Sequence, residues 1–337
     1  MSRGRGGGRA ASRVWHGGGM PADAPTSPLA AAHRAAREGV ALIERPEVGK
    51  LAITGLDTIP FVQAHVTVDV ATILDGAGRM GALLTAKGAL LGTLRILRAG
   101  DALLLDCERP ALQGIYVALH RGRVGWQIDL GKRTLQETQI SLVGPGAAAA
   151  AGLDDGAAEH DHRLVAVGGV EARAIRTPDG VDLRLPVEDA PAVVRALVAG
   201  GAVPGDEALW EVLRVEAGRA GYGSELDERT LPADAGLVPD VVALDKALYP
   251  GMQTVLRQDR SGTVHRTLRG LRSATPLIAG EPVRDAAGAE LGTVGTAVLS
   301  PVHGPLALAL LRRSAEPGVE VTAGETAAIV AALPWTF

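Results

Sequence analysis

Short apolar runs alternate with glycine-containing turns along the first half of the chain. Residues 51–53 are expected to form a strand that ends at Gly55. A helix cap at Asp57 or Thr58 follows, and Pro60 lies in the first helical turn, where proline is tolerated. The same pattern predicts a helix at 111–120 and strands at 80–84, 90–97, 102–106 and 124–128. This mixture predicts an α+β unit with a largely antiparallel sheet.

The pattern breaks at residues 145–156, which are rich in alanine, glycine and aspartate and predict a flexible connection. A second α+β unit is expected after it. Its predicted strands are 164–167, 172–175 and 181–185, and its predicted helices are 187–199 and 206–216. The first of these helices stops at Gly200-Gly201, a common kind of helix end.

Short strands separated by glycines follow Lys246. They are expected at 254–256, 264–271, 282–283, 291–299 and 306–311, a spacing typical of a small antiparallel barrel. The chain is thus predicted to hold a tail at 1–28, a first α+β domain at 29–150, a second α+β domain at 151–244 and a β-barrel domain at 245–337.

Composition fits two or three compact units in a chain of 337 residues. The 34 lysines and arginines nearly balance 38 aspartates and glutamates, so charge gives no general attraction to nucleic acid or to an anionic membrane. No apolar run reaches the roughly 20 residues that span a bilayer. The single cysteine, Cys107, excludes an internal disulfide framework and a Cys-rich metal site. A soluble, cytoplasmic protein is predicted.

The glycine- and arginine-rich segment 1–28 is predicted to be disordered. It has neither the apolar core of a secretion signal nor a helical amphipathic pattern. A dispensable tail, or a true start at Met20, is the favoured interpretation.

Three segments in the last third carry acids, a lysine and tyrosines. They are Arg214-Val215-Glu216-Ala217-Gly218, Tyr222-Gly223-Ser224-Glu225-Leu226-Asp227-Glu228 and Lys246-Ala247-Leu248-Tyr249-Pro250-Gly251. Together they predict a pocket rim with charges of both signs. Glu216 falls at the C-terminal end of a predicted helix, where the helix dipole disfavours a negative charge, so it needs a partner.

In this order, the three segments resemble the folate-binding core of the GcvT/YgfZ superfamily, which comprises YgfZ-type folate-binding proteins and the glycine-cleavage aminomethyltransferases. The resemblance extends from about Leu51 to the C-terminus. It implies two α+β domains and a C-terminal antiparallel β-barrel around a central hole that receives tetrahydrofolate or a one-carbon derivative. It also implies that Glu216 accepts two parallel N–H bonds from the pterin ring. The cofactor-binding residues implied are Glu216, Tyr222, Glu225, Lys246 and Tyr249.

Each of these residues also has an ordinary structural explanation. Glu216 would close its helix by pairing with Arg214 or Arg219. The acids of the second segment, Glu225, Asp227 and Glu228, would form a solvated turn. Tyr222 would pack on the core, and Tyr249 would belong to a Tyr-Pro-Gly turn. In the functional interpretation, Tyr249 stacks on an aromatic ligand. Lys246 either compensates the negative charge of Glu216 or reaches the carboxylate tail of folate.

Two departures from the family pattern bear on function. YgfZ-type proteins usually carry a cysteine where this chain has Leu248, and a leucine can neither ionise nor ligate a metal. Aminomethyltransferases carry two aspartates where this chain has Gly92 and Thr93, so an acid beside the reacting nitrogen of folate is missing there. Cys107 ends an apolar strand, where a small buried hydrophobic role is expected rather than thiol chemistry.

Two functional hypotheses follow. The favoured one is a tetrahydrofolate-binding, YgfZ-like accessory protein that helps to maintain iron–sulfur enzymes without turnover of its own, with those enzymes or their assembly proteins as partners. The alternative is a folate-dependent one-carbon transferase or demethylase in which Asp69 or Glu216 does acid–base work. The His160-Asp161-His162 cluster resembles a metal clip but is expected to be a solvated loop, so no metal site is predicted.

Overall fold

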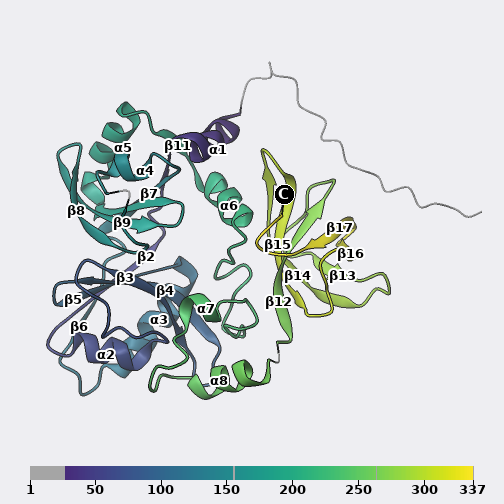
Figure 1. Cartoon of the computed structure of the whole chain (residues 1–337), viewed down its shortest axis with the longest axis horizontal. Coiled ribbons are helices and arrows are strands. Elements are labelled where there is room, and N and C mark those ends of the chain that lie inside the picture. The colour runs from purple at the N-terminus through teal and green to yellow at the C-terminus, as the bar shows by residue number, and fades with distance from the viewer. Residues whose placement is uncertain (1–26, 155, 263, 337) are drawn as a thin grey trace, which may run out of the picture.

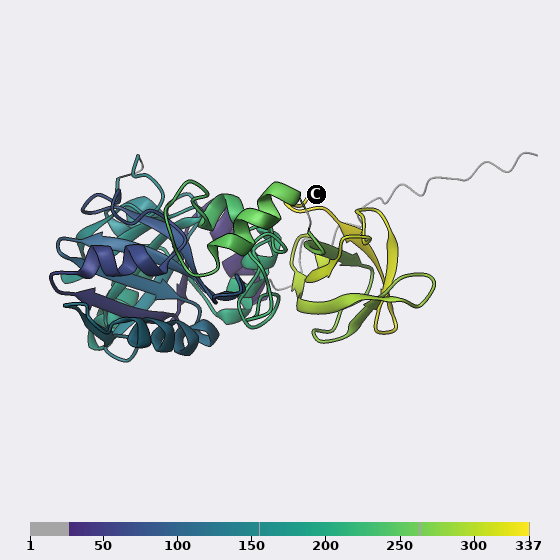
Figure 2. The same cartoon turned by 90° about the horizontal axis from the view of Figure 1, so that it is seen from below.

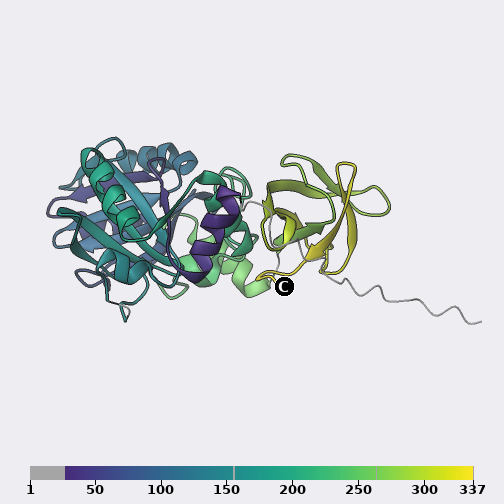
Figure 3. The same ribbon diagram turned by 90° about the horizontal axis from the view of Figure 1, so that it is seen from above.

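The computed structural model describes residues 27–154, 156–262 and 264–336. The predicted tail, except for its last two residues, lies outside the described residues, and so does Met20. Figure 1 shows two stacked sheets with their helices on one side of the molecule and a separate barrel on the other. Helix α6 (Glu207–Glu216) runs between them. The two turned views show that the barrel lies beside the two-sheet body, which makes the molecule elongated (Figures 2 and 3).

The five-stranded sheet has the order β3-β4-β5-β2-β6, and all its neighbouring strands are antiparallel. Its strands are β2 (Gly49–Thr54), β3 (Gly78–Leu84), β4 (Leu90–Ala99), β5 (Ala102–Cys107) and β6 (Asp129–Lys132). Helices α2 (Thr58–His65) and α3 (Arg109–Gly122) cover one face. They bury Phe61 and Ile115 in the same apolar core as Leu94 and Ile96 of β4, which alternate along the strand as a half-buried sheet requires.

The six-stranded sheet has the order β11-β1-β7-β10-β9-β8, in which only the β1–β11 pair is parallel. Its strands are β1 (Ala41–Glu44), β7 (Glu137–Val143), β8 (His162–Val167), β9 (Val170–Thr177), β10 (Gly180–Pro186) and β11 (Val203–Gly205). Helices α4 (Ala147–Ala151) and α5 (Ala190–Ala199) share its main core. Helix α1 (Pro28–Glu38) packs with α6 over the β1–β11 edge, where Ala32, Ile43 and Leu209 are buried.

The two sheets do not follow the predicted division of the chain at residue 150. Strands β1 and β7 lie within 29–150, yet they belong to the sheet that β8–β11 complete. The chain starts the six-stranded sheet at β1, builds the whole five-stranded sheet, and returns at β7. Strand pairing between distant segments decides this exchange, and a local pattern does not contain that information.

The two sheets meet through buried charges rather than through apolar side chains alone. Arg95 of β4 donates to Asp106 of β5 at 2.9 Å and to Asp182 of β10 at 2.6 Å. Arg184 of β10 bonds the other oxygen of Asp106 at 2.8 Å and also pairs with Glu137. Because each of these acids faces at least one guanidinium, the charges compensate each other at the contact.

The C-terminal strands close into a barrel, as the sequence predicts, in the order β12-β15-β14-β13-β16-β17. Its strands are β12 (Arg266–Ser273), β13 (Pro282–Arg284), β14 (Glu290–Ser300), β15 (Gly304–Arg312), β16 (Glu320–Ala323) and β17 (Thr326–Ala331). Leu271, Val283 and Leu311 lie in its core. The α+β fold with two largely antiparallel sheets and a C-terminal antiparallel barrel is confirmed.

Three local predictions are wrong. Residues 124–128 are not a strand: Val124 is exposed, Gly125 has φ 87° in a turn, and β6 begins only at Asp129. The predicted flexible connection contains the short buried helix α4. The predicted strand at 254–256 lies inside α8 (Met252–Ser261).

Gly251 sets the start of α8. It has φ 80°, and a Cβ there would lie 2.6 Å from the Cα of Gly88 in the β3–β4 turn. Only glycine fits this left-handed, closely packed position without strain. The start of α8 at Gly251 therefore depends on close packing against the backbone of the distant β3–β4 turn. The short helix α7 (Val238–Val241) and strands β16 and β17 were not predicted either.

Candidate functional site

Helix α6 and the turn after it hold most of the predicted site residues. The helix begins where predicted, since the Asp206 side chain caps it by accepting from the Leu209 N–H at 3.2 Å. It buries Leu209, Val212 and Val215. Arg214 and Glu216 are two positions apart, so they face different neighbours at the C-terminal end of the helix.

Glu216 is buried, and its partners come from outside the helix. His33 Nε2 lies 2.9 and 3.0 Å from its two carboxylate oxygens, Ser300 of β14 donates to Oε1 at 2.6 Å, and Arg37 of α1 pairs with Oε2. Burial pushes the pKa of Glu216 up, but the hydrogen bonds from Ser300, His33 and Arg37 more than offset this and leave the pKa below its ordinary value. The acid therefore has its partners, but they are neither Arg214 nor Arg219.

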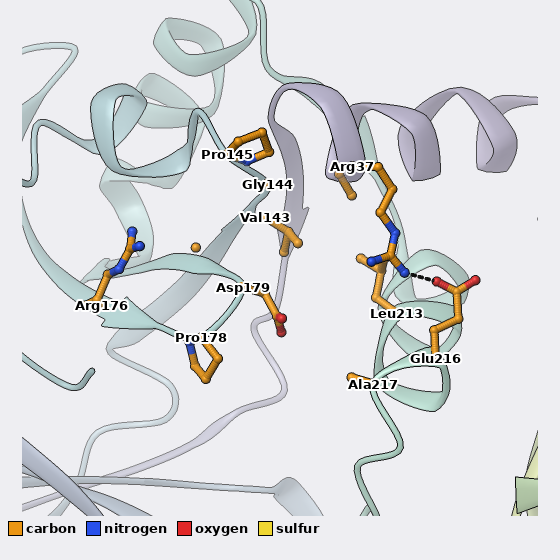
Figure 4. A pocket seen from close by; sticks show the side chains of 12 residues that line it. Arg37, Val143, Gly144, Pro145, Arg176, Pro178, Asp179, Leu213, Glu216 and Ala217 are labelled. Atoms are coloured by element: carbon orange, nitrogen blue, oxygen red, sulfur yellow. Dashed lines mark hydrogen bonds and ion pairs between the residues drawn. The ribbon is translucent and has the colours of Figure 1, made fainter. Parts of the chain in front are cut away.

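A cavity of about 330 Å³ lies beside Glu216. Figure 4 shows Arg37 reaching from α1 to the Glu216 carboxylate on one side, with Pro145 and Asp179 on the opposite wall. Asp179 itself pairs with Arg219. None of the other four predicted site residues lines this cavity, so Glu216 stands apart from them.

Arg214 and Glu225 form a buried pair that ties the turn to the barrel. Arg214 Nη1 lies 3.0 Å from Glu225 Oε2, which also accepts from the Gly221 N–H at 2.7 Å. Glu225 Oε1 accepts from the Thr296 N–H of β14 at 2.7 Å, and Arg214 Nη2 donates to the Thr296 hydroxyl at 2.6 Å. Both oxygens of Glu225 thus hold protein groups, and this acid is not in a solvated turn.

Tyr222 connects the same turn to the five-stranded sheet. Its hydroxyl lies 3.3 Å from the Leu90 carbonyl oxygen, to which it donates, and its backbone N–H donates to Glu108 Oε2 at 2.8 Å. Tyr222 packs against the apolar cluster that also contains Leu90, Leu226 and Tyr249. The two tyrosines of the predicted site are therefore brought to one cluster.

Tyr249 is buried, and its hydroxyl has no hydrogen-bond partner within the described part of the chain. A buried hydroxyl without a partner is costly unless a ligand or water supplies one. Burial raises the pKa of this phenol. This unsatisfied hydroxyl lies among the buried members of an aromatic and aliphatic cluster.

Lys246 is buried close to Tyr249 but does not face Glu216. Its ammonium donates to the carbonyl oxygens of Gln63 and Val66 at the C-terminal end of α2, and it lies 5.6 Å from the Tyr249 ring centroid. The last carbonyls of a helix lack partners in the next turn, and a cation at this end also suits the helix dipole. Burial lowers the pKa of Lys246 to about 8. Lys246 therefore caps the C-terminal end of α2. It does not compensate the charge of Glu216, as one interpretation of the sequence suggested.

The departures from the family pattern are visible as well. Gly92 is buried, and Thr93 is partly exposed on β4. Leu248 is 77% exposed, so the position where YgfZ-type proteins carry a thiol lies at the surface. Burial raises the pKa of Cys107 to about 12, in agreement with the role of a small buried hydrophobe.

His160 and His162 do not lie in a solvated loop. Both side chains are largely buried, and burial lowers both of their pKa values to about 4. Among the described residues, no cluster of three or more His, Cys, Asp or Glu side chains could hold a metal ion. In the same residues no helix is both long and apolar enough to cross a membrane.

Four residues that contact predicted site residues were not predicted from the sequence: Glu108, His33, Arg37 and Ser300. His33 and Arg37 are four residues apart, the spacing that places two side chains on one helix face. That spacing was a usable signal. Nothing local connects Ser300 to Glu216, since they lie 84 residues apart.

Known proteins match this chain over most of its length. The family model for the GCVT N-terminal domain matches residues 18–246. An aminomethyltransferase of Rubrobacter xylanophilus is 27% identical over 92% of this chain and 86% of its own, and one of Herpetosiphon aurantiacus is 30% identical over 87% and 84%. The crystal structure of glycine cleavage system aminomethyltransferase T from Bartonella henselae has a TM-score of 0.79 and 23% identity, covering 91% of this chain and 89% of that one.

The structural likeness shows a common fold. The family model covers more than half of the chain, and a relative at 30% identity spans most of it. The chain belongs to the GcvT family.

Proposed function

We propose that this protein binds tetrahydrofolate and transfers a one-carbon unit to or from it. The observation that carries the proposal is the GcvT-domain match over 18–246, together with aminomethyltransferases as relatives over most of the chain. Aminomethyltransferases of this family use tetrahydrofolate as the acceptor of the one-carbon unit. The proposed binding region is the cluster formed by Tyr222, Tyr249 and Leu90 with the neighbouring Glu108.

The residues present suit a reduced folate. A flat heterocycle with N–H donors and ring nitrogens needs an apolar wall and a few polar groups that fix its orientation. The two tyrosines with Leu90 and Leu226 supply the wall, and the Tyr249 hydroxyl still needs a partner. In this proposal Glu225 and Lys246 hold the turn and α2 in place, because both are engaged by protein groups.

The predicted pterin contact of Glu216 requires a rearrangement. Both carboxylate oxygens are bonded to His33, Arg37 or Ser300, so two parallel bonds to a ligand would have to displace these partners. We therefore assign Glu216 the role of joining α1 and α6 to the barrel.

A YgfZ-like accessory role in iron–sulfur enzyme maintenance is the second candidate. Gly92 and Thr93 favour it, because aminomethyltransferases have acids at these positions and a threonine does not ionise near neutral pH. The exposed Leu248 argues against thiol chemistry in such a role. In this candidate, folate binding is retained and turnover is not.

A tetrahydrofolate titration followed by calorimetry and thermal unfolding tests the shared part of both candidates. A ligand that binds only the folded protein raises the melting temperature by mass action, so a concentration-dependent increase is expected. Tyr249→Phe should weaken binding, while Tyr116→Phe on α3, outside the proposed cluster, should not. No heat and no melting shift at millimolar tetrahydrofolate would contradict folate binding.

A transfer assay separates the two candidates. Carbon-13 methylene-tetrahydrofolate is incubated with ammonium and a dithiol, and labelled aminomethyl thioether is followed by nuclear magnetic resonance. Protein-dependent transfer above the spontaneous rate supports the one-carbon transferase. Tight folate binding without transfer supports the accessory role.

A further inference from the structure

We propose that Glu108 does the acid–base work of the aspartate that aminomethyltransferases carry at the position of Thr93. In this proposal Glu108 contacts the reacting nitrogen of bound folate and takes up its proton. The inference rests on the proposed folate-binding function. It concerns a carboxyl group that directly follows β5, the strand next to the one where aminomethyltransferases carry their acids.

The strand register places Glu108 opposite Thr93. Strands β4 and β5 pair Arg95 with Asp106 and Leu94 with Cys107. The paired register ends there, because β5 stops at Cys107. If it is continued by one residue, Thr93 comes opposite Glu108, the first residue after β5. Directly opposed residues point to the same face of a sheet, and so do alternate residues along a strand. By this continuation we infer that Glu108 lies on the same face as Thr93, directly after the end of the neighbouring strand β5.

Contacts place the carboxyl group beside the proposed binding cluster. Glu108 Oε2 accepts from the backbone N–H of Tyr222, whose ring packs with Tyr249 and Leu90. The Glu108 side chain has no other hydrogen bond within the described residues, so Oε1 is left without a partner. The residue is partly exposed, which leaves the carboxyl group accessible to a ligand.

A purely structural role as a helix cap does not account for the contacts of Glu108. Glu108 is the N-cap residue of α3, the position where a short polar side chain normally accepts from the first turn of the helix. Its carboxylate makes no such capping bond. The charges of Arg45 and Arg214 lower the pKa of Glu108, but these two arginines form their ion pairs with Glu47 and Glu225.

The surroundings suit proton transfer near neutral pH. Burial raises the pKa of Glu108, and the charge of Glu225 raises it further. The Tyr222 N–H and the charges of Arg214 and Arg45 act in the opposite direction but do not cancel the effect of burial. A carboxyl group with a raised pKa exchanges a proton more effectively at neutral pH than an ordinary one does.

The step balances without an oxidant or reductant. As the folate nitrogen forms its bond to the one-carbon unit, its N–H bond breaks and Glu108 accepts the proton. The bond between the carbon and the leaving amine or thiol breaks, and its electron pair leaves with that group. Glu108 then gives its proton to the leaving group and returns to the ionised form.

Calorimetry in two buffers of different ionisation enthalpy tests the proposal without relying on turnover. The full chain is titrated with tetrahydrofolate between pH 5 and 8, and the number of protons exchanged on binding is measured. The wild type should exchange protons over this range. Glu108→Gln should remove that exchange, and any loss of affinity should stay below a hundredfold. Glu228→Gln, an exposed acid of the same turn, is the matched control and should behave as the wild type.

The transfer assay supplies the second measurement. Glu108→Gln should lower the transfer rate about a hundredfold or more, the usual contribution of a positioned acid or base. Thr93→Asp in the Glu108→Gln background should recover part of that loss, because it returns a carboxyl group to the same face.

The possible outcomes are distinct. Absence of tetrahydrofolate binding in the wild type defeats the proposed function. Binding with wild-type proton exchange and wild-type transfer in Glu108→Gln overturns the role of Glu108 alone. A loss of affinity above a hundredfold in Glu108→Gln would make it a binding residue instead, and folate binding without any transfer by the wild type would also overturn the acid–base role.

Discussion

Two acids of one stretch of backbone, Asp106 within β5 and Glu108 just after it, differ in how many partners their carboxyl groups have. At one step of the register, Arg95 and Asp106 belong to a charge network that Asp182 and Arg184 complete across the two sheets. Two residues beyond Asp106, just past the end of β5, the carboxyl group of Glu108 has a single hydrogen bond, which comes from the backbone N–H of Tyr222. Paired charges lock the sheets together, whereas an acid with a free oxygen next to a cluster of tyrosines remains available to a ligand.

Asp106, Cys107 and Glu108 are consecutive, so they give three direct comparisons within one stretch of backbone. The first faces the buried charges, the second faces the apolar core under α3, and the third faces the proposed site.

Asp106→Asn should cause the largest loss of stability. It leaves two buried guanidinium groups, those of Arg95 and Arg184, without one of their counter-charges. Removing one partner of a buried ion pair costs about 3–5 kcal/mol. Urea unfolding measures the change. Asp154→Asn, which removes an exposed partner of Arg163, should cost less than about 1 kcal/mol, and equal losses in both variants would show that burial is not the cause.

Glu216→Ala should lower the free energy of unfolding by about 2–3 kcal/mol, because hydrogen bonds to a charged group contribute about 1.5–3 kcal/mol and His33, Ser300 and Arg37 would all lose theirs. Glu47→Ala, at an exposed pair, is the control. A folded-state pKa below the unfolded value of 4.5 gives stability that is present above pH 4.5 and lost as pH falls through the folded pKa. Glu216→Gln should lack that acid-dependent loss; a matching acid profile would contradict the assignment.

Cys107→Ala should cost about 1 kcal/mol, since it removes one buried sulfur next to Leu112 and leaves a small cavity. It should leave tetrahydrofolate affinity unchanged. A thiol whose pKa is raised to about 12 should react slowly with thiol reagents in the native protein, and this is measured by labelling at pH 8. Rapid labelling would mean that Cys107 is accessible and ionised.

Glu108→Gln should have the smallest effect on stability, below about 1 kcal/mol, because an amide oxygen can still accept from the Tyr222 N–H. The raised pKa predicts the sign of the pH dependence. Ionisation costs the folded state stability as pH rises from the unfolded value of 4.5 through the folded pKa, and glutamine does not ionise. The stability of the variant relative to the wild type should therefore increase from pH 4 to pH 8. A constant difference would show that Glu108 has an ordinary pKa.

Local pattern was sufficient for much of the fold. The strands β4, β5, β10 and β15 were predicted because apolar residues recur with the two-residue period of a sheet and glycines mark the turns. Helix α6 was predicted because an aspartate cap precedes a helical apolar face. The motif order of the last third indicated the family, and the match over 18–246 confirms that resemblance at the level of the GcvT family.

The tertiary structure alone decided which groups meet. Nothing local in the sequence joins Glu216 to His33 or Arg37, which lie 183 and 179 positions away. Strand pairing likewise assigned β1 and β7 to the second sheet, and the folded chain brought Glu108 to the backbone N–H of Tyr222, 114 positions away. The physical reason is that periodicity and capping depend on neighbours within a turn or a strand, whereas charge pairing and site geometry depend on groups that are close only after the chain has folded.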